Sequence, residues 1–197
     1  ITNGSADIVA LGRSLLTDPD FANKCADGHC CDVRTCMMCN KGCTDNIQNR
    51  AFLSCVLNAE NGYETSRQIT PAVTAKRIAI IGAGIAGLEA ARVAALRGHQ
   101  VTIFEKSLQI GGQLLIASVP PRKEEMMRSI NYYLNVLPEL SVTFRLGQEF
   151  TGKDYDSFDE VIVATGATNA IIPVPGKDLP TVTSAWDILA KKEIVFG

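Results

Sequence analysis

The chain has 197 residues, of which 46% are hydrophobic, which is enough for one large or two small domains with an ordinary core. Its 19 basic and 21 acidic residues give a net charge of −2, which argues against a nucleic-acid partner. No apolar run reaches membrane-spanning length and no signal-peptide pattern opens the chain, so we expect no membrane partner.

Residues 6–13 form a short apolar run that ends in Gly12 and Arg13. A run of this length predicts a buried parallel strand. A glycine N–H and a guanidinium at the carboxyl end of such a strand suit a phosphate, although Arg13 fits a solvated loop equally well. The Thr-Asp-Pro sequence at 17–19 then predicts the start of a helix that Gly28 ends.

Four of the seven cysteines share the spacing C-x2-C-x3-C-x11-C: Cys36, Cys39, Cys43 and Cys55. Thiolates are soft ligands, and close spacing lets one loop surround a metal centre. The spacing favours a [4Fe-4S] cluster, because zinc ribbons usually carry two closely spaced pairs; zinc and unligated cysteines remain alternatives. An odd cysteine count with this spacing indicates a reducing, cytoplasmic environment. The other three are interpreted as small buried side chains: Cys25, Cys30 and Cys31.

A second motif begins after a polar connector. Residues 76–81 predict a strand, the sequence G-x-G-x-x-G follows at 82–87, and residues 88–97 predict a helix. A further strand at 100–104 ends at Glu105. A glycine-rich turn between strand and helix, with an acid about twenty residues further on, is typical of dinucleotide binding. The alternative is a tight turn without a ligand.

Each glycine of this motif has an expected role. Gly82 permits the tight turn, Gly84 lets the backbone approach a pyrophosphate, and Gly87 lets the helix pack on the strand. The helix N-terminus adds oriented N–H groups. Glu105 can accept hydrogen bonds from an adenosine ribose.

The remaining segments complete an alternating α/β pattern. Helices are predicted at 122–137 and 184–191, and strands at 142–146 and 160–164. The first helix carries an apolar stripe expected in the core: Met126, Ile130, Tyr133, Leu134 and Leu137. Glycines at 111–112 and 166 would allow close approach to a nucleotide, and plain loops are the alternative.

With these motifs in place, the chain resembles the old-yellow-enzyme-like iron–sulfur flavoenzymes, which include 2,4-dienoyl-CoA reductase, trimethylamine dehydrogenase and anaerobic enone reductases. The resemblance covers nearly the whole chain. Residues 6–21 resemble the last strand and helix of that family's FMN-binding barrel, which implies that Gly12 and Arg13 hold the FMN phosphate. Residues 34–40, with Cys43 and Cys55, resemble its [4Fe-4S] loop.

The segments from the glycine motif onward resemble the family's FAD domain, where some members bind ADP instead of FAD. The resemblance implies these cofactor-binding residues: Gly82, Ala83, Gly84, Gly87, Glu105, Lys106, Gly112, Gln113, Thr165 and Gly166.

The expected fold class is therefore α/β. A Rossmann-like, three-layer FAD/NAD(P)-binding domain is preceded by the last βα unit of a TIM barrel and by a four-cysteine iron–sulfur loop. The expected boundaries are 1–30 for the barrel end, 31–70 for the cluster loop and connector, and 71–197 for the first part of the FAD domain.

The resemblance implies an NAD(P)H-dependent flavin oxidoreductase that relays electrons from FAD through the cluster to FMN and reduces an enoyl or dienoyl substrate. We expect this stretch alone to be inactive, because most of the barrel and the nicotinamide domain would lie outside it, and no catalytic residue can be named. Two alternatives stay open: an FAD enzyme with an N-terminal cluster, like the small subunit of glutamate synthase, and a non-catalytic, zinc-stapled nucleotide-binding module. The sequence leaves the oligomeric state open.

Overall fold

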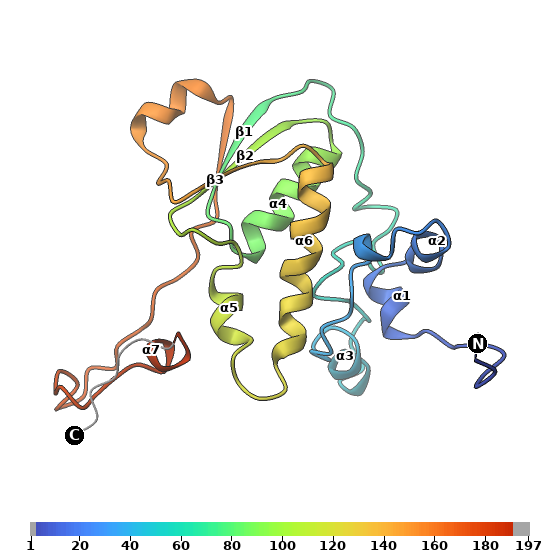
Figure 1. Ribbon diagram of the computed structural model, residues 1–197, viewed down its shortest axis with the longest axis horizontal. Coiled ribbons are helices and arrows are strands. Elements are labelled where there is room, and N and C mark those ends of the chain that lie inside the picture. The colour runs from blue at the N-terminus through green and yellow to red at the C-terminus, as the bar shows by residue number, and fades with distance from the viewer. Residues whose placement is uncertain (1–2, 191–197) are drawn as a thin grey trace. The chain divides into compact units, whose positions relative to one another are not determined.

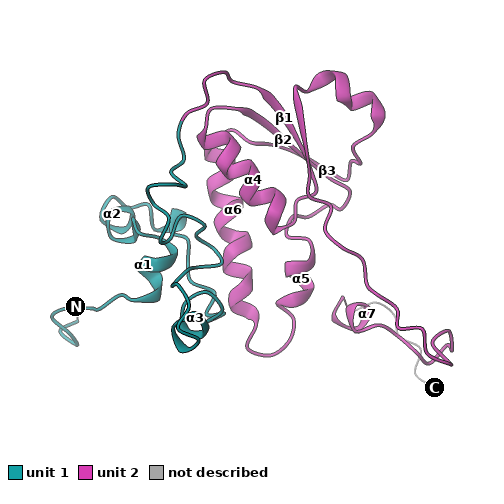
Figure 2. Ribbon diagram, turned by 180° about the vertical axis from the view of Figure 1, so that it is seen from behind, with its two compact units in different colours: residues 1–70 teal, residues 71–197 magenta. Residues whose placement is uncertain are grey.

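The computed structural model describes residues 3–190, and these form parts of two compact units, residues 1–70 and 71–197 (Figure 2). Within the described residues, no helix has both the length and the apolar character needed to cross a membrane.

Unit 1 is built from short helical segments joined by irregular loops. Its described segments are α1 (Arg13–Thr17), α2 (Phe21–Ala26), the 3-10 helix η1 (Cys30–Asp32) and α3 (Thr44–Gln48). Val33 and Leu57 are its buried hydrophobic side chains among these residues. A unit with so few buried apolar groups gains little from hydrophobic burial, so other interactions must hold its loops.

Three predictions for unit 1 need correction. The run at 6–12 forms no strand, and Ile8 is 86% exposed, because no described strand of this unit lies beside it to complete a hydrogen-bond ladder. The helix predicted to start at 17–19 begins only at Phe21, as α2, and it does end just before Gly28, whose φ is +83°; α1 precedes the predicted helix and was not expected. Cys30 and Cys31 are exposed, not buried.

Unit 2 is a parallel α/β domain (Figure 1). Its four described strands are β1 (Arg77–Ile81), β2 (Gln100–Glu105), β3 (Thr143–Leu146) and β4 (Glu160–Val163), in the order β3-β2-β1-β4. Its described helices are α4 (Ile85–Leu96), α5 (Gln113–Ala117), α6 (Met127–Glu139) and α7 (Ala185–Leu189), with the 3-10 segments η2 (Glu124–Met126) and η3 (Gly152–Ser157). All strand pairs are parallel, so the carboxyl ends of β1, β2 and β4 lie at one edge of the sheet.

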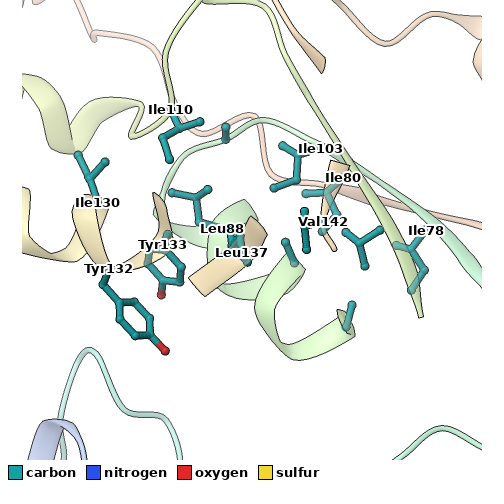
Figure 3. Close-up of a cluster of buried hydrophobic side chains, with 14 residues drawn as sticks. Ile78, Ile80, Leu88, Ile103, Ile110, Ile130, Tyr132, Tyr133, Leu137 and Val142 are labelled. Carbon is teal, nitrogen blue, oxygen red and sulfur yellow. The ribbon is translucent and has the colours of Figure 1, made fainter. Parts of the chain in front are cut away.

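The core of unit 2 lies between this sheet and helices α4 and α6 (Figure 3). Ile80 of β1 pairs in register with Ile103 of β2, and both are fully buried beneath Leu88 of α4 and Leu137 of α6. Burial of each such side chain contributes about 1.5–3 kcal/mol. This core fixes where β1 ends and where α4 begins, which is where the glycine motif lies.

The predicted stripe of α6 is confirmed in part. Ile130, Tyr133 and Leu137 are buried, and Met126 is half-buried in η2. Leu134 is 51% exposed, which contradicts its predicted place in the core. The helix buries a stripe centred on the other three positions, which recur at i, i+3 and i+7, and this leaves its flank in solvent.

The other face of the sheet carries an aromatic cluster. Phe104 alternates with Ile103 along β2 and so points to the opposite face. Its ring makes edge-to-face contacts with Phe150 and Phe158, at centroid distances of 5.0 and 5.7 Å. Helix α7 falls within the predicted segment 184–191, whose last residue lies outside the described part of the chain.

Candidate cofactor sites

The four cysteines with regular spacing line one pocket in unit 1. Arg13 and Thr17 of α1 lie on the same pocket wall, and four apolar side chains complete much of the lining: Leu16, Met37, Val56 and Leu57. All four cysteines are half-buried and none forms a disulfide. The fold thus places thiols that are up to 19 positions apart in the sequence around one pocket.

The cysteine loop is shaped by two tight backbone features. Met38 and Asn40 adopt left-handed φ angles of +56° and +60°, which turn the chain sharply on either side of the second cysteine, Cys39. Ser54 N donates a 2.7 Å hydrogen bond to Gly42 O, and a Cβ at Gly42 would lie only 2.6 Å from Ser54 O. This close approach places the segment that carries Cys55 beside the loop.

Three of the four sulfur atoms have a polar neighbour. Met38 N donates to Cys36 Sγ at 3.4 Å, Thr17 Oγ1 lies 3.6 Å from Cys55 Sγ, and Thr44 Oγ1 lies 3.8 Å from Cys43 Sγ. Donors aimed at sulfur stabilise the anionic thiolate that binds a metal. The donor set and its surroundings therefore fit a thiolate-ligated iron–sulfur cluster.

The arrangement does not define a site for a single ion. Within residues 3–190, no three His, Cys, Asp or Glu side chains converge closely enough to hold a metal ion. A tetrahedral zinc site would need four sulfur atoms at about 2.3 Å from one point. The identity of the metal centre on Cys36, Cys39, Cys43 and Cys55 remains a prediction.

Arg13 lies beside the cysteine loop. Its Nη1 donates a 2.9 Å hydrogen bond to Asn40 Oδ1, between the second and third cysteines. Gly12 is exposed and precedes the first residue of α1. The role of this pair at an FMN phosphate stays a prediction, and the structure adds a contact that the sequence could not show.

The glycine motif of unit 2 forms a tight turn between β1 and α4. Gly82 has φ +106°, and a Cβ there would lie 2.5 Å from Ala164 O at the end of β4. A Cβ at Gly87 would overlap the carbonyl oxygen of Gly82. Both glycines are therefore required by the packing of the chain itself.

Gly84 differs, because nothing in the chain requires it to be glycine. Its φ of −74° and ψ of 175° suit any residue, and an added Cβ would meet no atom within 4 Å. It stands at the N-cap of α4, where no side chain caps the helix. Open space beside uncapped N–H groups at a helix N-terminus is what a pyrophosphate needs.

Glu105, the last residue of β2, is hydrogen-bonded to the glycine turn between β1 and α4. Its Oε2 accepts a 2.8 Å hydrogen bond from Ala83 N, and its Oε1 accepts bonds of 2.9 Å from both Ser107 N and Ser107 Oγ. Partial burial raises the pKa of Glu105, but these hydrogen bonds outweigh it and hold the pKa below its ordinary value. The side chain is thus a carboxylate at neutral pH.

Two further segments border the same turn. Gly111 N donates to Ala83 O at 2.8 Å, which draws the paired glycines against the motif. Gln113 Nε2 donates to Ala167 O at 2.7 Å and so ties the start of α5 to the chain after β4. Thr165 and Gly166 lie in that chain, and they and Lys106 are exposed. Their contacts with a nucleotide remain predictions.

Residues 10–135 and 76–195 each match the family model described as pyridine nucleotide-disulphide oxidoreductase. The chain belongs to this family. It is 54% identical to the bilirubin reductase of Mediterraneibacter gnavus over 100% of the chain and 31% of that protein. It is 36% identical to the cinnamate reductase of Clostridium sporogenes over 99% of the chain and 29% of that protein.

A solved structure gives the same result. The chain superposes on a 2-naphthoyl-CoA reductase complex with a TM-score of 0.93 and 33% identity, over 96% of the chain and 29% of that protein. Within the oxidoreductase family, these relatives belong with the old-yellow-enzyme-like flavin oxidoreductases, so the resemblance inferred from the motifs is confirmed. The chain spans about a third of the length of the relatives it matches.

Family membership confirms a Rossmann-like, FAD/NAD-binding α/β domain with a parallel sheet. The barrel unit and the cluster loop remain predictions. Sequence reasoning missed the parts of Thr17 and Asn40 in the cysteine pocket. The sequence marks Thr17 only as a helix-start residue, because no local pattern reveals a partner 38 positions away.

Proposed function

We propose that the intact protein is an NAD(P)H-dependent oxidoreductase that uses FAD, a [4Fe-4S] cluster and FMN to reduce an unsaturated small molecule. The observation that carries this proposal is the pocket in which all four spaced cysteines meet, in a chain that also holds a dinucleotide-binding turn. Neither feature alone requires the other. Their presence in one chain suits a protein that passes electrons between cofactors of different kinds.

The relatives indicate the class of substrate. They are named as reductases of bilirubin, cinnamate and 2-naphthoyl-CoA, which are conjugated unsaturated molecules. We propose a conjugated carbon–carbon double bond as the reduced group, with enoyl and dienoyl thioesters included.

Bound cofactors would supply one-electron transfer at the cluster and hydride acceptance at the flavin. The chain's own residues bind and orient them. Cys36, Cys39, Cys43 and Cys55 supply thiolates from a largely apolar pocket, which limits access of water. Residues 82–87 leave space for a pyrophosphate, and we assign the ribose to Glu105.

The test uses the intact protein under anaerobic conditions, with NADH or NADPH as donor and cinnamate or an enoyl-CoA as acceptor. Cys39→Ser removes one proposed ligand, and Cys31→Ser is the matched control, because Cys31 is exposed and does not line the pocket. We expect Cys39→Ser to keep reduction of its FAD by NAD(P)H and to lose at least about 100-fold in turnover of the acceptor, the scale on which ligand-shell changes act.

Cys31→Ser should match the wild type in both reactions. Acceptor turnover by Cys39→Ser within twofold of the wild type would show that electrons do not pass through the cysteine pocket. Loss of both reactions in Cys39→Ser would instead indicate that the pocket is structural, as in the zinc-stapled alternative.

A further inference from the structure

Helix α1 forms one wall of the cysteine pocket. Hydrogen bonds join the helix and the residue that follows it to three segments that carry or flank the cysteines. Arg13 Nη1 donates to Asn40 Oδ1 at 2.9 Å, in the loop between the second and third cysteines. Asp18, just after the helix, accepts a 2.8 Å bond from Arg34 N, ahead of the first cysteine. Asn58 Nδ2 donates to Leu16 O at 2.9 Å, beyond the fourth cysteine.

Thr17 is the residue of α1 that contacts a sulfur atom. It is only 2% exposed, its Oγ1 donates a 2.9 Å hydrogen bond to Arg13 O, and the same oxygen lies 3.6 Å from Cys55 Sγ. A buried hydroxyl at this distance is within range of a hydrogen bond to sulfur. The helix does not need the bond from the Thr17 hydroxyl. A carbonyl oxygen inside a helix already accepts a hydrogen bond from the backbone N–H four residues further on.

The direction of this hydrogen bond follows from the state of the cysteine. A cysteine that binds a metal carries no proton on sulfur, so the Thr17 hydroxyl is then the one donor of the pair. The hydroxyl carries one hydrogen, so it donates to Cys55 Sγ by rotating away from Arg13 O, and no heavy atom has to move.

Resting on the proposed function, we infer that Thr17 is a positioning residue that donates a hydrogen bond to the sulfur of Cys55 and thereby raises the reduction potential of the cluster. A donor to a ligand sulfur draws off negative charge and stabilises the reduced cluster, which carries one more electron. Burial strengthens the effect, because little water competes for the sulfur.

The experiment compares the wild type and four variants of the intact, cluster-loaded protein by anaerobic redox titration. Thr17→Val keeps the side-chain shape and removes the hydroxyl, whereas Thr17→Ser keeps the hydroxyl. Thr35→Val is the matched control, because the Thr35 hydroxyl donates to Val33 O and lies outside the pocket lining. Iron and sulfide are measured on every sample first.

We expect a full cluster in every form and a lower midpoint potential only in the variants that lack the hydroxyl, Thr17→Val and Thr17→Ala. An unchanged potential in Thr17→Val, or an equal fall in Thr17→Ser, would overturn the assignment. Thr17→Ala, which removes the hydroxyl without adding bulk, must shift the potential in the same direction as Thr17→Val. If both assemble no cluster while Thr17→Ser does, the hydroxyl is needed to hold the ligand, which supports the contact. Zinc in the wild-type protein would instead contradict the proposed function, before any variant is compared.

Discussion

Glu105 shows how a single carboxylate can serve both the fold and a ligand. A carboxylate offers about four acceptor positions, and the bonds from Ala83 N, Ser107 N and Ser107 Oγ use three of them. One position remains for a ribose hydroxyl. Because the hydrogen bonds keep the pKa of Glu105 below its ordinary value, this contribution is present at neutral pH and is lost only as the pH falls through that lowered pKa.

Replacing Glu105 by glutamine should weaken ADP binding by about 1–3 kcal/mol, the range for loss of a charged hydrogen-bond partner. The amide retains the shape but turns one acceptor into a donor that faces Ala83 N or Ser107 N. Calorimetry of ADP binding to the flavin-free intact protein measures the effect, with Glu149→Gln, an exposed acid, as control. Equal affinities in wild type and Glu105→Gln would remove Glu105 from the nucleotide site.

At the scale of elements, the β1–α4 turn contains both glycines that the packing requires and a glycine that it does not require. A methyl group at Gly87 would overlap Gly82 O and press on Ile80, whereas a methyl group at Gly84 would meet nothing. The two positions lie three residues apart in one helix start, so each is a control for the other.

Gly87→Ala should therefore lower the free energy of unfolding by about 1–3 kcal/mol, the usual cost of overpacking. Gly84→Ala should lower that free energy by less than Gly87→Ala does, because the added methyl meets no atom and only the weaker N-cap preference of alanine opposes it. It should reduce ADP affinity by at least about tenfold, or 1.4 kcal/mol, because the methyl group takes the space of the pyrophosphate. Thermal unfolding and ADP titration measure the two effects, and normal ADP binding by Gly84→Ala would contradict a pyrophosphate at this turn.

Elements specified by local pattern were predictable from the sequence, and elements that depend on distant partners were not. Strands β1 and β2 and helix α4 follow from apolar runs around a glycine motif. The run at 6–12 has the same apolar character, but a strand also needs a neighbour to pair with. Leu134 shows the corresponding limit of helix prediction, because it was expected in the core and is exposed. Periodicity predicts that a helix has an apolar stripe, but the width of the buried stripe depends on the elements that pack against it.

The candidate sites follow the same rule. Cysteine spacing and the glycine motif were sufficient to name the proposed ligands, because both kinds of site draw on residues close in sequence. The contacts of Thr17 with Cys55 and of Arg13 with Asn40 join positions 38 and 27 residues apart. No local pattern encodes such pairs, so they had to come from the fold.

At the scale of the whole molecule, the two units depend on different sources of stability. Unit 2 has a continuous core of buried side chains between sheet and helices (Figure 3). The described part of unit 1 buries Val33 and Leu57, and polar contacts such as the Asp18–Arg34 and Asn58–Leu16 hydrogen bonds and the Lys24–Asp18 ion pair also hold it. A bound metal centre would supply the missing stabilisation, because the binding free energy of a structural metal is also folding free energy.

The iron, sulfide and zinc content of the intact protein, purified without oxygen, is the most direct test of the proposed cluster. We predict about four iron and four sulfide per chain, as a [4Fe-4S] centre requires, and loss of both in Cys39→Ser but not in Cys31→Ser. One zinc per chain with no sulfide would contradict it.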